Sequence, residues 1–104
     1  MDYEIVITPE AENDFYAYMN YLLYKEKNPL AARNFISDFE KTKNRLALVA
    51  GNLKLCDDSH LHKLGFRRIN FSKMNYFLLY RVENHTVLIY KIFHSLQDYV
   101  NITE

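Results

Sequence analysis

Two helix-start signals of the same kind, Thr8-Pro9 and Asn28-Pro29, constrain the first half of this chain more than any other feature. In each signal a residue that caps a helix N-terminus precedes a proline, which suits the first helical position because it has no N–H to leave unpaired. Apolar residues follow each signal at helical spacing: first Ala11, Phe15, Tyr18, Met19, Leu22 and Leu23, then Ala32, Phe35, Ile36, Phe39, Leu46 and Val49. The pattern predicts one helix to about Lys27 and a second that ends near Gly51. Because the connection is short, the two helices are expected to lie antiparallel.

The apolar period changes from helical to strand-like after Gly65. Residues 68–71 alternate, residues 76–82 are nearly continuously apolar as in a central strand, and residues 86–93 are rich in β-branched and aromatic side chains. Residues 3–7 predict a further short strand, and the polar stretch 51–65 predicts a loop. The expected order is β-α-α-β-β-β in a single domain over residues 1–104. This is an α+β fold in which the antiparallel helix hairpin packs on one face of a largely antiparallel four-stranded sheet.

The last two strands predict a hairpin with Asn84-His85 as its two-residue turn. Glu83 then pairs with Thr86, Val82 with Val87, and Arg81 with Leu88. One face of the hairpin is expected to carry Tyr76, Leu78, Tyr80, Val82, Val87, Ile89, Lys91 and Phe93. The other face is expected to carry Phe77, Leu79, Arg81, Leu88, Tyr90, Ile92 and His94. These assignments depend on the register, because a slip of one residue exchanges the faces.

Composition excludes several classes of protein. The 104 residues suffice for one domain, and no apolar stretch approaches the length of a membrane span, so no membrane partner is expected. No secretory leader pattern opens the chain, which predicts a cytoplasmic protein. The single Cys56 cannot close an intrachain disulfide, and no nucleotide-binding or familiar hydrolase motif occurs, so no cofactor is expected. His60-x-His62 near Asp57 and Asp58 has ligand types but no second cluster, so no metal site is expected either.

Charge places any anion-binding surface in the second half of the chain. Thirteen Lys and Arg balance thirteen Asp and Glu, so the whole molecule has no net field that would steer it onto nucleic acid. Residues 1–52 carry six basic and eight acidic side chains, whereas residues 53–104 carry seven and five. The second half therefore has a net charge of +2.

Several segments together resemble the RelE/ParE toxin superfamily. They are residues 7–12 (ITPEAE), Arg67-Arg68-Ile69, residues 76–82 (YFLLYRV) and the closing residues 92–99 (IFHSLQDY). The resemblance spans nearly the whole chain and implies the toxin of a bacterial type II toxin–antitoxin pair, held inactive by a cognate antitoxin. It implies two possible targets, because the ParE-like branch poisons DNA gyrase and the RelE-like branch cleaves mRNA on the ribosome.

Four positions separate the two branches. The resemblance places Arg68 and Asn70 where the RelE-like branch uses two lysines, and Phe77 and Gln97 where it uses two arginines. Only one of the four positions is basic here, whereas cleavage of RNA needs cations around the scissile phosphate and a group that activates the 2′-OH. The ParE-like branch is therefore favoured, with Arg81 after the second tyrosine of its strand and His94 at the end of the last strand.

Arg68, Arg81 and His94 are the candidate catalytic residues. In the alternative ribonuclease, Arg68 and Arg81 clamp phosphate through their guanidinium groups, and His94 or Tyr90 transfers the proton. The structural alternatives are strand arginines that are solvated or paired with a carboxylate, and a histidine that only caps its strand. A third reading is a degenerate toxin that serves as a protein-binding module, in which Arg81 and His94 are both sequestered.

Tyr21 and Tyr24 are the candidate partner-binding residues. The first helix has more tyrosines than its apolar stripe requires, and tyrosine is enriched at interfaces. An antitoxin segment that folds on binding is expected to cover Tyr21, Tyr24 and Arg81, with weak or no homodimerisation of the toxin. The alternative is that these tyrosines merely lie along the helix hairpin.

Overall fold

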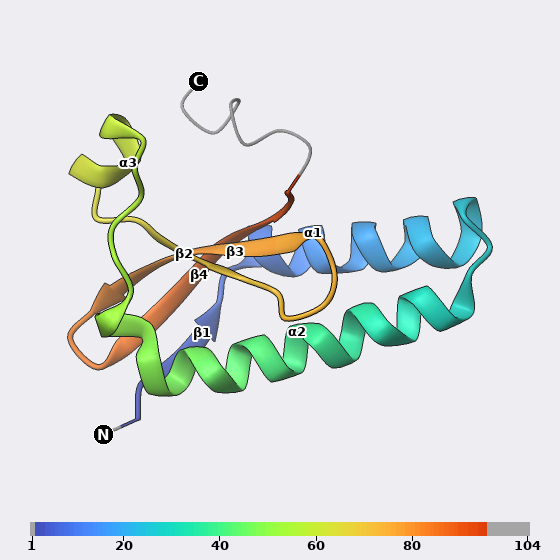
Figure 1. Cartoon of the computed structure of the whole chain (residues 1–104), viewed down its shortest axis with the longest axis horizontal. Helices are drawn as coiled ribbons and strands as arrows, with labels where there is room; N and C mark the ends of the chain where they lie inside the picture. The colour runs from blue at the N-terminus through green and yellow to red at the C-terminus, as the bar shows by residue number, and fades with distance from the viewer. Residues whose placement is uncertain (1, 96–104) are drawn as a thin grey trace.

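A computed structural model describes residues 2–95 and shows two long helices on one side of a four-stranded sheet (Figure 1). The element order confirms the predicted α+β fold. In chain order the elements are β1 (Glu4–Ile7), α1 (Pro9–Asn20), η1 (Tyr21–Lys25), α2 (Pro29–Val49), η2 (Ala50–Asn52), α3 (Ser59–Lys63), β2 (Arg67–Asn70), β3 (Tyr76–Glu83) and β4 (Thr86–His94). No helix within these residues is long and apolar enough to cross a membrane.

Both long helices begin at the predicted signals. Thr8 Oγ1 accepts a hydrogen bond from the Ala11 N–H at 3.2 Å, and Asn28 Oδ1 accepts one from the Ala31 N–H at 3.0 Å. The end of the first helix is wider than expected, because it finishes in the π-helical turn η1. Lys27 then adopts a positive φ of 53°, which reverses the chain so that α1 and α2 run antiparallel (Figure 1).

The sheet has the strand order β1-β4-β3-β2, in which β1 is parallel to β4 and the other neighbours are antiparallel. β3 is central and is buried on both faces from Tyr76 to Tyr80, as its continuous apolar sequence predicted. We call the side under α1 and α2 the inner face and the opposite side the outer face. The inner face holds the main core, which includes Phe35, Phe71, Tyr76, Leu78, Tyr80, Ile89 and Ile92.

The hairpin turn is confirmed, but the predicted faces of β4 are wrong beyond Ile89. Glu83 pairs with Thr86 and Arg81 with Leu88 as expected, whereas Tyr80 pairs with Ile89 and Leu79 with Lys91, so the pairing skips Tyr90. This β-bulge inserts one residue and shifts the later alternation by one. Lys91 and Phe93 therefore belong to the outer face, and Ile92 and His94 to the inner face.

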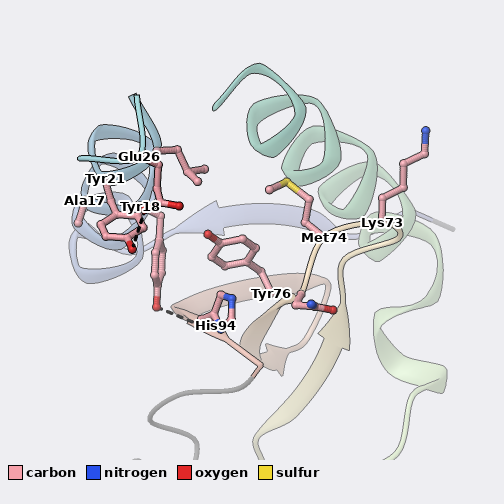
Figure 2. Close-up of a pocket in the computed structure, with 10 residues that line it drawn as sticks. Ala17, Tyr18, Tyr21, Glu26, Lys73, Met74, Tyr76 and His94 are labelled. Atoms are coloured by element: carbon pink, nitrogen blue, oxygen red, sulfur yellow. Dashed lines mark hydrogen bonds between the residues drawn. The ribbon is translucent and has the colours of Figure 1, made fainter. Parts of the chain in front are cut away.

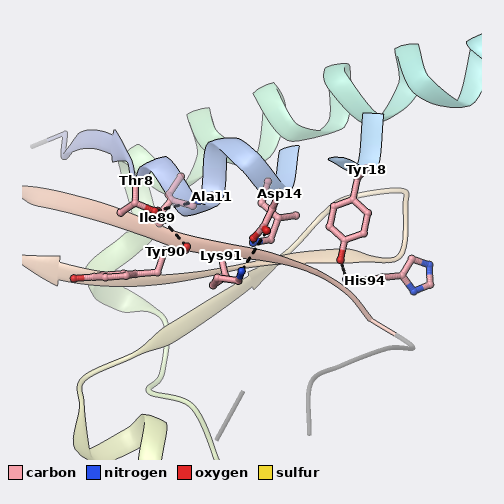
Figure 3. Close-up of polar contacts among 9 residues, drawn as sticks. Thr8, Ala11, Asp14, Tyr18, Ile89, Tyr90, Lys91 and His94 are labelled. Atoms are coloured by element: carbon pink, nitrogen blue, oxygen red, sulfur yellow. Dashed lines mark hydrogen bonds and ion pairs between the residues drawn. The ribbon is translucent and has the colours of Figure 1, made fainter. Parts of the chain in front are cut away.

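The bulge lies where β4 changes its neighbour at the sheet edge. β1 pairs with β4 only as far as Ile89, and α1 replaces it beyond that point. There the Asp14 carboxylate accepts from the Ile92 N–H at 3.0 Å, and the Tyr18 hydroxyl accepts from the His94 N–H at 3.2 Å (Figure 3). Side chains of α1 thus satisfy the strand edge that β1 leaves open, because a buried N–H needs an acceptor.

Two smaller expectations are also wrong. The helical spacing predicts Ile36 on the buried stripe of the second helix, yet its side chain is 38% exposed because the neighbouring Phe35 takes the core position. The polar stretch 51–65 is not wholly a loop, since it contains α3, whose first N–H groups are capped by Asp58 through a 3.0 Å bond from Leu61. Leu61 of this short helix packs with Cys56 and Leu79 and so covers part of the outer face.

Candidate functional site

The structure brings Arg68 and Arg81 to the outer face. Arg68 pairs with Leu79 across β2 and β3, and Arg81 lies two residues after Leu79, so all three side chains share that side of the sheet. The Arg68 guanidinium carbon lies 3.7 Å from the centroid of the Phe77 ring, and its Nη2 donates to Asn70 Oδ1 at 2.9 Å. The Arg81 guanidinium carbon lies 5.7 Å from the Phe66 ring, and its Nη2 is 3.9 Å from a Glu83 carboxylate oxygen.

Aromatic rings surround these two cations. The rings of Phe66 and Tyr90 meet edge to face at 5.1 Å, and those of Phe77 and Phe93 stack at 5.4 Å. Lys91 adds a third cation, 5.9 Å from the Phe93 ring and 3.2 Å from Asp14. We name this set the cation–aromatic face; it consists of Phe66, Arg68, Phe77, Arg81, Tyr90, Lys91 and Phe93. Arginine and aromatic side chains are the groups that most often anchor protein interfaces.

His94 lies apart from the cation–aromatic face. It is on the inner side at the end of β4, where its ring meets that of Tyr76 edge to face at 5.1 Å. It lines an open cleft of about 620 Å³ between the end of α1, the β2–β3 turn and the end of β4 (Figure 2). The sheet therefore separates the candidate proton-transfer residue His94 from both candidate phosphate clamps.

The candidate partner residues Tyr21 and Tyr24 both lie in η1. Their exposed fractions are 47% and 72%, which agrees with the expectation that they exceed what the core requires. The Tyr21 hydroxyl donates to a Glu26 carboxylate oxygen at 3.4 Å, and Tyr21 lines the same cleft as His94. Tyr24 is not part of the cleft. Because both tyrosines are exposed and belong to η1, they offer aromatic surface at the end of the helix hairpin where α1 leads into α2.

Asp38 is a structurally important residue that the sequence analysis did not single out. Although it is only 4% exposed, its carboxylate accepts three backbone hydrogen bonds, from Ser72 at 3.1 Å, Lys73 at 3.0 Å and Met74 at 2.8 Å. It thereby fixes the β2–β3 turn that forms one wall of the cleft. Its position three residues after Phe35, on the apolar stripe of α2, is the signal that would have marked it.

The buried phenols and the thiol are held in their neutral forms. Burial raises the pKa of Tyr80, whose hydroxyl donates to the Ala50 carbonyl at 2.9 Å. Burial also raises the pKa of Tyr76, with a smaller contribution from Tyr18 and Tyr21. The pKa of the Cys56 thiol is raised by burial as well, so little thiolate forms at neutral pH. None of these three groups is suited to act as a base near pH 7.

The remaining candidates make local contacts. His62 Nδ1 lies 3.2 Å from the Cys56 carbonyl oxygen, and across residues 2–95 no three His, Cys, Asp or Glu side chains come together to hold a metal ion. The guanidinium of Arg67 donates to the Leu53 carbonyl. Gln97 lies outside the described residues.

The helix hairpin on a four-stranded sheet is the fold that the resemblance to RelE/ParE toxins implied. The family model of the ParE toxin of the type II toxin–antitoxin system parDE matches residues 5–99. The chain therefore belongs to the ParE toxin family and is a toxin of a type II toxin–antitoxin system, as its sequence predicted.

Two solved structures share the fold. The chromosomal ParDE toxin–antitoxin system from P. aeruginosa contains a chain with a TM-score of 0.71 and 18% identity, covering 88% of this chain and 95% of that one. The toxin–antitoxin complex RelBE2 from Mycobacterium tuberculosis contains one with a TM-score of 0.62 and 21% identity, covering 90% and 92%. A comparison with curated protein sequences gives no significant match.

Proposed function

We propose that this toxin inhibits growth by binding DNA gyrase rather than by cleaving mRNA. The observation that supports this proposal most is the position of His94, which lies across the sheet from Arg68 and Arg81. Cleavage of RNA needs a base at the 2′-OH and cations at the phosphate in one place. An interface needs only anchors, and the cation–aromatic face supplies arginines and aromatic rings for that role.

The ribonuclease alternative now depends on Tyr90. This residue shares the outer face with Arg81, because the Phe66 ring contacts both of them. In that alternative Tyr90 transfers the proton while Arg68 and Arg81 hold the phosphate. The degenerate-toxin alternative is less well supported, since it expects Arg81 and His94 to be sequestered, whereas the Arg81 side chain is 37% exposed and His94 lines an open cleft.

The test is a DNA supercoiling assay with purified gyrase beside a cell-free translation assay, both with the purified toxin. Supercoiling should stop while translation and transcripts remain intact. Arg81→Ala should lower the inhibitory potency about thirtyfold, the equivalent of ~2 kcal/mol for an interface anchor. His94→Ala is the matched control and should keep full potency, with circular dichroism showing that both variants are folded. Cleaved transcripts with undisturbed supercoiling would refute the proposal, and loss of that cleavage in Tyr90→Phe would establish the alternative.

We further propose that a cognate antitoxin neutralises the toxin by covering the hairpin end at Tyr21 and Tyr24 together with Arg81 on the outer face. Both related structures come from toxin–antitoxin systems, and these two tyrosines offer exposed aromatic area next to a cleft. Amide hydrogen exchange over residues 16–27 and around Arg81 should slow when the antitoxin saturates the toxin. Unchanged exchange in these segments would place the antitoxin elsewhere.

A further inference from the structure

The cleft beside His94 is a concave surface that the proposed gyrase contact leaves unused. It has three walls, formed by the end of α1 with η1, the β2–β3 turn and the last residue of β4 (Figure 2). Aromatic and apolar side chains dominate its lining, namely Tyr18, Tyr21, Leu22, Met74 and Tyr76. Lys73 and Glu26 add one charge of each sign. A surface of this kind accepts apolar side chains that carry some polar neighbours.

The chain leaves the described fold at the edge of this cleft. The His94 N–H donates to the Tyr18 hydroxyl, and the Ser95 N–H donates to the Asn75 carbonyl at 2.7 Å. Both acceptors belong to residues that line the cleft, so these bonds hold residues 94 and 95 at its rim. Nine residues follow, 96–104, which reach at most about 30 Å when extended. That length is enough for the segment to extend from the rim into the cleft.

The sequence of residues 96–104 suits the cleft. Leu96, Tyr99 and Val100 recur at the i, i+3, i+4 spacing that gathers apolar side chains on one side of a helical turn. The polar residues Gln97 and Asp98 stand between them in the sequence, and Asp98 and Glu104 are acidic. The chain thus brings apolar groups for the aromatic walls and negative charge for Lys73.

We propose that residues 96–104 of the same chain dock into this cleft, with Leu96, Tyr99 and Val100 against Tyr18, Met74 and Tyr76. Because the segment is tethered at the rim, its effective concentration is on the order of millimolar, so weak contacts suffice to hold it. The docking concerns the isolated toxin and does not depend on the target proposed above.

Nuclear magnetic resonance of the full chain, labelled with ¹³C at the methionine methyl groups, tests the docking. The sequence has three methionines, of which Met74 lines the cleft and Met19 packs against the inner core. The Met74 methyl should show nuclear Overhauser contacts to side chains of residues 96–100. Tyr99→Ser should abolish these contacts and shift the Met74 methyl resonance, because the nearby ring is lost, while the Met19 resonance stays in place.

Gln97→Ser is the matched control, since it changes a polar residue of the same segment and should leave the Met74 resonance where it was. The proposal would be overturned if the unmodified chain showed no such contacts and the Met74 methyl resonance had the same chemical shift in the Tyr99→Ser variant as in the unmodified chain. Contacts that appear only between differently labelled molecules would also overturn it, because they place the segment in the cleft of a second copy.

Discussion

The two faces of the sheet are built from similar aromatic residues but are covered in different ways. On the inner face the Phe35 ring lies 4.9 to 6.1 Å from the rings of Phe15, Tyr18, Phe71 and Tyr76, and it is fully buried. On the outer face the rings of Phe66 and Phe93 are only partly buried, and guanidinium and ammonium groups lie over the aromatic surface. The inner face therefore provides most of the stability.

Side chains of α1 and α2 also accept hydrogen bonds from backbone N–H groups of the sheet and of the β2–β3 turn. The elements that cover the outer face do this to a smaller extent. Asp38 holds the β2–β3 turn and Asp14 holds the edge of β4, each through charged acceptors of backbone N–H groups. The outer face has a five-residue helix and cation–ring contacts instead. A face covered in this way keeps side chains available to a partner, which is why we assign target binding to it.

The largest difference between the two faces, in the free energy of unfolding, is expected when one aromatic ring is removed from each. Phe35→Ala should lower the free energy of unfolding by about 3–5 kcal/mol, because it leaves a cavity among packed rings. Phe66→Ala should cost only ~1–2 kcal/mol, since less apolar area returns to water. Urea unfolding followed by circular dichroism measures both. An equal loss in the two variants would show that the outer face is a second core.

A smaller loss is expected from removing the acceptor on α2. Asp38→Ala leaves three backbone N–H groups of the β2–β3 turn without their carboxylate and should cost ~2–3 kcal/mol. Asp57→Ala is the control, because that carboxylate is 84% exposed and pairs only with an exposed lysine; its effect should stay within about 0.5 kcal/mol. The same urea titration applies, and amide exchange at residues 72–74 should accelerate only in the first variant. If the two variants unfold alike, the turn does not depend on α2.

The smallest effect is expected from the outer cation that lies nearest to a ring. Arg68→Ala should lower the free energy of unfolding by about 0.5–1 kcal/mol, the usual contribution of a partly exposed cation–π contact. Arg68→Lys should recover only part of this loss, because an ammonium group cannot stack as a planar guanidinium does. Thermal and urea unfolding of the three proteins decides the point. A cost above ~2 kcal/mol would mark Arg68 as a structural residue rather than one kept for binding.

Local signals predicted the elements, and contacts between distant segments determined what could not be predicted. The caps at Thr8 and Asn28 and the turn at Asn84 depend on neighbouring residues, so both helix starts and the hairpin turn were predicted correctly. The bulge at Tyr90 depends on where β1 ends and on Asp14 and Tyr18, which are more than seventy residues away in the sequence. No local pattern in β4 marks it.

The same division between local signals and contacts of distant segments explains which parts of the candidate site could be predicted. Arg68 and Arg81 share a face because β2 and β3 pair without a bulge, so simple alternation holds across these two strands. His94 lies after the bulge, so alternation placed it on the wrong side. Asp38 was overlooked because its three bonds connect α2 to a turn more than thirty residues later.

The bulge at Tyr90 also decides which face of the sheet carries the end of β4. Deleting Tyr90 would restore regular pairing but would leave Phe93 opposite Phe77 and His94 opposite Tyr76, on the faces that they now occupy. Closing the bulge with Tyr90 retained would instead move every later residue of β4 by one position, so that Phe93 would lie on the side of the helices and His94 on the side of Arg81. The way in which the last strand accommodates one extra residue thus decides, in geometric terms, whether an imidazole stands on the surface that carries the guanidinium groups.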